Sequence, residues 1–169
     1  MKLKVLAAGL ALAVLAGCGT SPYVPTEYPL RAGLIPPRPV SGDVTINNAQ
    51  ADTAQALVYE YGGSNLASDY KTITQALVNQ ATKELATAGQ KAPGKAKTID
   101  VKVTYMKSTY IAFYWKSELK YTATLGNAAT IDNTVNHGSG VLIQDLNGLI
   151  AESAMNLLND PKVLAYLAE

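Results

Sequence analysis

The amino-acid sequence predicts an α+β domain in which two amphipathic helices pack on one face of an antiparallel sheet. Apolar residues recur at three- and four-residue spacing over residues 70–85 and 143–158, which is typical of helices with one buried face. Between these segments, residues 98–125 alternate apolar and polar side chains, which is typical of strands with one buried face. Strands and helices that follow one another in separate blocks indicate the α+β class.

The composition fits a single domain and gives no sign of a highly charged partner. The chain has 169 residues, of which 48% are hydrophobic and 16% charged, enough apolar material for a single core. Its formal net charge of +1 gives no reason to expect nucleic acid or an acidic substrate.

The N-terminal residues have the pattern of a secretory signal peptide. Lys2 and Lys4 precede an apolar run from Val5 to Ala16. This run is shorter than the roughly 20 residues of a spanning helix. We expect residues 1–17 to be removed, which leaves a nearly neutral chain.

Cys18 is the only cysteine, and its neighbours predict a lipid attachment site. The sequence "LAGC" (15–18) resembles the bacterial lipobox, in which cleavage after Gly17 leaves a diacylglyceryl-modified Cys18 at the new N-terminus. An incidental cysteine after an ordinary signal peptide and a buried free thiol are the alternatives, and both fit the position and its flanks less well. Acyl chains anchor by about 0.8 kcal/mol per buried methylene. Gly19 stands where an Asp would favour the inner membrane, so we expect the outer membrane, on its periplasmic side.

Residues 18–40 are expected to be a lipidated cysteine followed by a proline-rich tether. Residues 19–40 hold six of the eight prolines, and an extended chain of this length reaches on the order of 70 Å. The alternative is that the second half docks on the domain through Leu30, Leu34 and Ile35. The folded domain is expected over residues 41–169.

The elements of that domain follow from local patterns. Strands are expected at 44–47 and 56–63, and a helix follows, capped by Ser68 or Asp69 and ended by Gly89 in a left-handed turn. "KAPGKAK" (91–97) is a basic turn.

The second half of the domain has equally clear signals. Strands are expected at 98–105 and 110–125, with a weaker returning strand at 130–138. Gly138, Ser139 and Gly140 form a hinge before the next helix. Asp160 and Pro161 are suited to cap and restart a last helix.

Several of these segments together resemble the YajG-type lipoprotein family of Gram-negative bacteria. The resemblance covers "LAGC", the proline-rich segment, "VTINNAQADTAQAL", "ALVNQATKELATAG", "IDVKVTY" and "IQDLNGLIAESAMNLLNDPKVLAYL". It implies an envelope lipoprotein and brings no catalytic residues with it.

The residues with catalytic potential do not form a known pattern. His137 is the only histidine, and Ser139 nearby lacks the glycine-flanked nucleophile motif. Asp132 and Asp145 lack metal-ligand spacing relative to His137. The "GSG" turn lacks the lysine of a phosphate-binding loop. We therefore expect neither enzymatic activity nor a metal or other cofactor.

The aromatic residues predict a contact surface. In "YMKSTYIAFYW" (105–115), alternation places Phe113 and Trp115 on the core face. Tyr110 and Tyr114 then lie on the opposite face, with Tyr59 or Tyr61 beside them on a neighbouring strand. Tyrosine is common at interfaces, and the alternative is cross-strand pairing that only stabilises the sheet.

These observations predict an outer-membrane-anchored, periplasm-facing lipoprotein that acts as a non-catalytic binding or envelope-assembly module. Its partners would be the membrane, through the lipid anchor, and an envelope protein or lipid met at the open sheet edge or outer face. The alternative function is handling of lipid or lipopolysaccharide in an apolar groove between sheet and helices. An envelope hydrolase acting through His137 is the third possibility.

Overall fold

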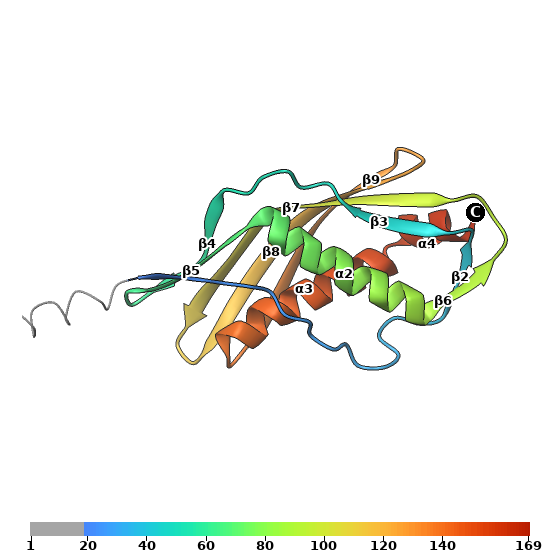
Figure 1. Ribbon diagram of the computed structural model, residues 1–169. Coiled ribbons are helices and arrows are strands. Elements are labelled where there is room, and N and C mark those ends of the chain that lie inside the picture. The colour runs from blue at the N-terminus through green and yellow to red at the C-terminus, as the bar shows by residue number, and fades with distance from the viewer. Residues whose placement is uncertain (1–18) are drawn as a thin grey trace, which may run out of the picture.

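Two helices cover one face of a twisted sheet in the computed structural model, which describes residues 19–169 (Figure 1). The predicted signal peptide and Cys18 lie outside the described residues. The α+β class is confirmed. In chain order the elements are β1 (Thr20–Pro22), β2 (Arg38–Ser41), β3 (Val44–Asn48), β4 (Gln55–Tyr61), β5 (Ser64–Asp69), α2 (Tyr70–Ala88), β6 (Gly89–Ala92), β7 (Lys97–Ile111), β8 (Tyr114–Leu125), β9 (Thr130–Ser139), α3 (Leu142–Asn159) and α4 (Pro161–Ala168).

The sheet is mixed, which corrects the expectation of an antiparallel one. Its strand order is β1-β5-β4-β7-β8-β9. Strand β3 also pairs with β7, at residues 97–101, on the same edge on which β4 pairs with Ser108. The β7–β8, β8–β9 and β4–β5 pairs are antiparallel, whereas β1–β5, β3–β7 and β4–β7 are parallel. The chain passes through α2 between β3 and β7, and such a crossover allows a parallel pair. A separate small sheet joins β2 and β6 in parallel.

Helix α2 begins as the sequence predicts but ends differently. Asp69 caps it, because its carboxylate accepts a hydrogen bond from the Thr72 backbone N–H at 2.7 Å. Gly89 is extended (φ −75°, ψ 121°) rather than left-handed, because the chain continues directly into β6. A Cβ at Gly89 would lie 2.7 Å from the Leu85 carbonyl oxygen, so close packing explains this glycine.

Helices α3 and α4 form the second part of the helical layer. Helix α3 packs against β8, β9 and α2, and it buries Leu146, Leu149, Ala154, Leu157 and Leu158. Asp160 caps α4 by accepting from the Lys162 N–H at 2.7 Å, and Pro161 occupies its first turn. None of the helices in residues 19–169 is both long and apolar enough to cross a membrane.

A bulge in β7 exchanges the two faces of the strand. The register against β8 shifts between Val103 and Tyr105. Val103 is fully buried, but after the bulge Met106 is buried while Tyr105 is 39% exposed. A one-residue insertion moves every later side chain to the other face. The expectation that Phe113 belongs to the core is therefore wrong: it lies in the β7–β8 turn and is 91% exposed.

Residues 20–38 lie against the domain, which corrects the expectation of a free tether. Strand β1 pairs with β5, and the Tyr23 hydroxyl, on a buried ring, donates to Asn147 Oδ1 at 2.8 Å. Further along, Ile35 and Arg38 are buried. Both halves of the proline-rich segment are therefore docked on the domain. The alternative interpretation of the sequence expected this for the second half only.

Candidate functional site

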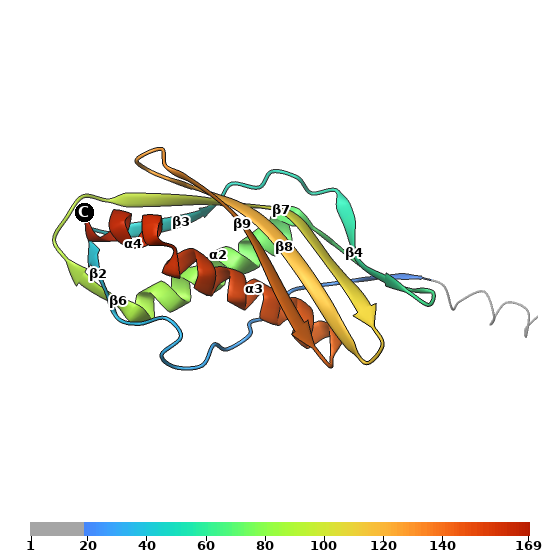
Figure 2. The ribbon, with the colours of Figure 1, turned by 180° about the vertical axis from the view of Figure 1, so that it is seen from behind.

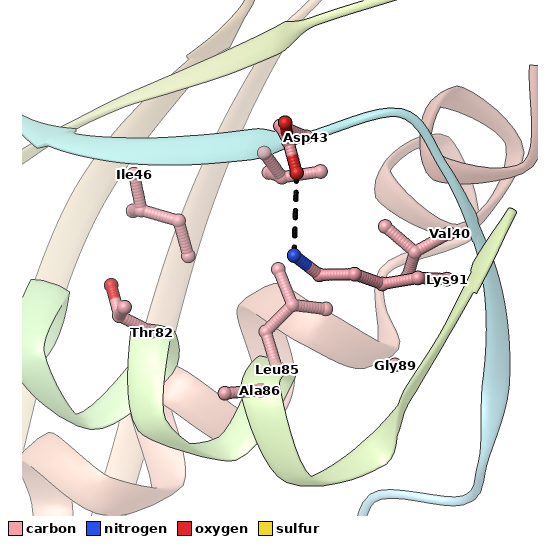
Figure 3. A pocket seen from close by; sticks show the side chains of 9 residues that line it. Val40, Asp43, Ile46, Thr82, Leu85, Ala86, Gly89 and Lys91 are labelled. Atoms are coloured by element: carbon pink, nitrogen blue, oxygen red, sulfur yellow. Dashed lines mark hydrogen bonds and ion pairs between the residues drawn. The ribbon is translucent and has the colours of Figure 1, made fainter. Parts of the chain in front are cut away.

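An apolar pocket lies between α2 and the strands β2, β3 and β6 (Figure 3). Its volume is about 150 Å³. Val40, Ile46 and Leu85 project into it from three different elements, and Ala86 lies at its rim. A volume of about 150 Å³ is that of a cavity that admits a ligand about as large as benzene. The pocket therefore suits one apolar group rather than a whole lipid.

Two of the residues that line this pocket form an ion pair. Lys91 Nζ lies 3.3 Å from Asp43 Oδ1, and both side chains are largely exposed. Exposed pairs contribute about 0–1 kcal/mol, so this pair is a weak obstacle to a ligand that enters the pocket.

A second candidate site is a buried polar cluster around Asp145. Asp145 stands in the first turn of α3 and is fully buried. Its carboxylate accepts hydrogen bonds from Ser108 of β7, at 3.2 Å, and from Ser117 of β8. His137 Nδ1 of β9 lies 2.9 Å from the other carboxylate oxygen. One side chain thus connects a helix to three strands.

The hydrogen bond between Asp145 and His137 favours the protonated imidazole. The hydrogen bond to Asp145 raises the pKa of His137 above its ordinary value, against an opposing effect of partial burial. The imidazole ring also packs on α3, since a Cβ at Gly148 would lie 2.6 Å from its Cε1. The sequence pattern does not show this cluster, because its members are 8 to 37 residues apart.

The cluster lacks the arrangement of a serine–histidine–aspartate site. In such a site the serine bonds to the histidine, whereas Ser108 and Ser117 both bond to the carboxylate. Ser139, the nearby serine considered from the sequence, accepts instead from the Val141 N–H at 3.3 Å. Within residues 19–169 no three His, Cys, Asp or Glu side chains are grouped to hold a metal ion.

The four tyrosines expected on one outer face are distributed differently. Tyr59 is buried. Tyr61 and Tyr110 touch, with ring centroids 5.0 Å apart, and Tyr110 contacts Trp115 at 5.1 Å. Tyr114 points to the other face of the sheet, because Tyr110 pairs with Trp115 and not with its neighbour Tyr114. The bulge in β7 causes this change of face, so the four residues do not form one surface.

Strand β9 forms one edge of the sheet. It covers ten residues, pairs with β8 on one side, and has no strand on its other side among the residues described. Its sequence "TIDNTVNHGS" contains one acidic residue, no lysine and no proline. Edge strands that are protected from other chains usually carry such residues. At the start of β9, Lys162 Nζ donates to the Thr130 carbonyl oxygen at 2.9 Å, and beyond that residue the strand has no lysine or proline of its own that would hinder pairing.

Comparison with known proteins adds no further information on function. No family model matches the sequence, and no curated protein is significantly similar to it.

Proposed function

We propose that this protein is a lipoprotein of the outer membrane, attached at Cys18 and facing the periplasm, that binds an extended segment of an envelope protein without catalysing a reaction. The observation that carries this proposal is the ten-residue open edge of β9. An extended peptide that adds to such an edge gains main-chain hydrogen bonds along its length, and alternate side chains give specificity.

Two further features support the proposal. The sequence "LAGC", which ends in Cys18, is the pattern that predicts the lipid anchor. The Asp145 cluster supports a non-catalytic role, because its serines bond to a buried carboxylate and are not activated by His137.

Crosslinking in intact cells tests the binding role. A photoreactive amino acid is placed at Thr134 or at Asn136 of β9, with Gln75 on the exposed side of α2 as the control position. If a partner strand adds to β9, both β9 probes should capture the same protein. The two captured sites should lie about two residues apart in the partner, because side chains on one face of a strand recur every second residue.

Two results would contradict the proposal. Probes on β9 that capture no specific protein would exclude β9 as the binding edge. Mass spectrometry that finds an unmodified Cys18 in the mature protein would separately exclude the anchor.

A second candidate function is the handling of lipid or lipopolysaccharide, and the apolar pocket of Figure 3 favours it. A pocket of about 150 Å³ would hold the end of one acyl chain. The substitution Ala86→Phe should fill the pocket and remove lipid that co-purifies with the protein, as measured by mass spectrometry. Ala165→Phe, at an exposed alanine of α4, is the control; equal lipid content in all three proteins would exclude this function.

A further inference from the structure

Exposed apolar side chains gather at one end of the molecule. Among the described residues, eleven large hydrophobic side chains are exposed, and six of these lie in or directly beside three neighbouring connections: β4–β5, β7–β8 and β9–α3. Figures 1 and 2 both show these connections at the end of the molecule opposite to the C-terminus. We call these six residues the apolar end: Tyr61, Ile111, Phe113, Tyr114, Val141 and Ile143.

The three connections at the apolar end contain no charged residues. Residues 61–64 read "YGGS", residues 111–114 read "IAFY" and residues 138–143 read "GSGVLI", without a single charged side chain. At the opposite end, the residues around β2, β6 and α4 include Asp43, Lys91, Lys95 and Glu169. The two ends of the molecule therefore differ: one is apolar and uncharged in its connections, and the other carries charged side chains.

The fold does not require an apolar side chain at the tip of the β7–β8 hairpin. Tight hairpin turns favour Gly, Asn or Asp, but the β7–β8 turn uses Ala112 and Phe113. Ala112 has a φ of 56°, which is unfavourable for a residue with a Cβ. Phe113 is 91% exposed and so contributes little to the core. Such a turn is better explained by contact with something outside the domain.

The chain enters the domain at this same end. Thr20 of β1 pairs with Asn65 of β5, next to Ser64, which is opposite Tyr61 in the β4–β5 hairpin. Cys18 precedes Thr20 by two residues in the sequence, and two residues span at most about 7 Å. Because residues 20–38 are docked, no long tether separates the predicted lipid from the apolar end.

We propose that the apolar end inserts into the surface of the membrane that carries the lipid anchor. This inference rests on the proposed attachment of lipid at Cys18. Tyrosine and tryptophan rings are favoured at the membrane interface because they join an apolar body to a polar tip. Phe113 and Ile143 would enter the boundary between headgroups and acyl chains. Lys116, which is exposed on β8 just beyond the hairpin tip, would reach anionic headgroups.

Membrane contact at this end would fix the orientation of the domain. The long axis would stand away from the bilayer, with α4 and the apolar pocket at the distant end. The β9 strand would then run from the membrane surface into the periplasm, which leaves its edge accessible to a partner.

The single tryptophan of the chain gives a direct test. Trp115 contacts Tyr110 and lies beside the apolar end. The lipidated full-length mature protein is reconstituted on vesicles of phosphatidylethanolamine and phosphatidylglycerol, with or without brominated acyl chains that quench tryptophan fluorescence. We expect the brominated lipid to quench Trp115 in the wild-type protein. Phe113→Ser combined with Ile143→Ser should abolish this quenching, whereas Leu164→Ser, at an exposed position of α4, should leave it unchanged.

Flotation of the same vesicles separates the two proposals. Protein that floats but shows no quenching would overturn the membrane contact while the anchor stands. Protein that neither carries lipid nor floats would overturn the anchor, and the inference with it. If the Cys18→Ser chain forms dimers in solution that Phe113→Ser abolishes, and the lipidated protein shows no quenching, the apolar end contacts a second copy instead.

Discussion

At Asp145, three polar side chains from three strands meet a single buried carboxylate. A buried charge is costly unless it is paired and hydrogen-bonded. Here the two serine hydroxyls and His137 provide the partners, so the carboxylate fixes the start of α3 relative to the sheet. The residues that resemble a catalytic set therefore have a structural explanation.

The His137–Asp145 pair makes stability depend on pH. The pKa of His137 is raised in the folded protein by the hydrogen bond to Asp145. Its contribution to the free energy of unfolding is therefore complete below the unfolded pKa near 6.5, and is lost as the pH rises through the folded pKa. Denaturant titrations between pH 5.5 and 8.5 should show stability from this pair decreasing with pH.

The variant Asp145→Asn should remove this pH dependence. It should also lower the free energy of unfolding by about 1.5–3 kcal/mol at pH 5.5, because hydrogen bonds to a charged group are lost. Asp132→Asn, at an exposed position of the same β9 strand, is the control and should keep the wild-type profile. An unchanged profile in Asp145→Asn would show that the pair does not control the pH dependence.

A third prediction concerns Gly148, where α3 meets the His137 ring. A glycine-to-alanine change inside a helix ordinarily stabilises it by about 1 kcal/mol. At Gly148 the new Cβ would lie 2.6 Å from the imidazole, so we expect a net loss of about 1–3 kcal/mol from overpacking. Thermal unfolding measures this loss; Gly140→Ala, where nothing lies within 4 Å, should be neutral or stabilising. Stabilisation by Gly148→Ala would mean that the ring moves aside without cost.

Among the elements, the end of α3 depends on a residue far away in the chain. The Arg38 guanidinium donates to the Leu158 carbonyl oxygen and to Asn159 Oδ1, the latter at 2.8 Å. Helix C-terminal carbonyl groups lack partners within the helix, and a planar guanidinium bonds two acceptors at once. This contact links β2 to the end of α3.

Arg38→Lys should therefore be destabilising although the charge is kept. We expect a loss of about 1.5–3 kcal/mol in the free energy of unfolding, since a buried charge-assisted hydrogen bond is lost. Denaturant unfolding measures it, with Arg31→Lys, at an exposed position, as the matched control. Equal stability of the two variants would show that an ammonium group is sufficient at this helix end.

The elements with strong local patterns were predictable, and those that depend on distant contacts were not. The spacing of Ile73, Leu77 and Leu85 and the cap at Asp69 define α2 from sequence alone. The bulge at residues 103–105 leaves no such signal, because Val103, Tyr105 and Met106 are all apolar and the alternation reads equally well on either face. Consequently, the faces of Tyr110 and Phe113 could not be assigned correctly from the sequence.

For the whole molecule, the position of the leading segment changes the geometry expected from the sequence. Prolines favour an extended chain, so the six prolines of residues 19–40 predict a segment that extends away from the domain. The contact that docks Tyr23 joins it to Asn147, 124 residues away, and no local pattern reveals such a pair. The apolar end could not be predicted from the sequence for the same reason, because its residues come from three separate parts of the chain.

The docking of this segment should depend on Asn147. Asn147 bonds the Tyr23 hydroxyl and the Thr26 hydroxyl, at 2.8 and 2.7 Å, so Asn147→Ala leaves a buried hydroxyl unpaired at a cost of about 1–3 kcal/mol. Hydrogen exchange should then be faster in residues 20–26. Asn133→Ala, which removes a bond to the Tyr121 hydroxyl, should leave exchange in this segment unchanged; unaltered protection in Asn147→Ala would show that β1 alone holds it.

The parallel pairing of β1 with β5 also determines how the domain would respond to mechanical force. The Tyr23 N–H extends this pairing beyond β1, because it donates to the Ala67 carbonyl oxygen at 2.7 Å. A pull on the N-terminus would act parallel to both strands, so the bonds between them would resist it together rather than open one after another. A domain held to a moving membrane through this strand would be loaded in shear, with the buried Tyr23 ring as the next point of resistance.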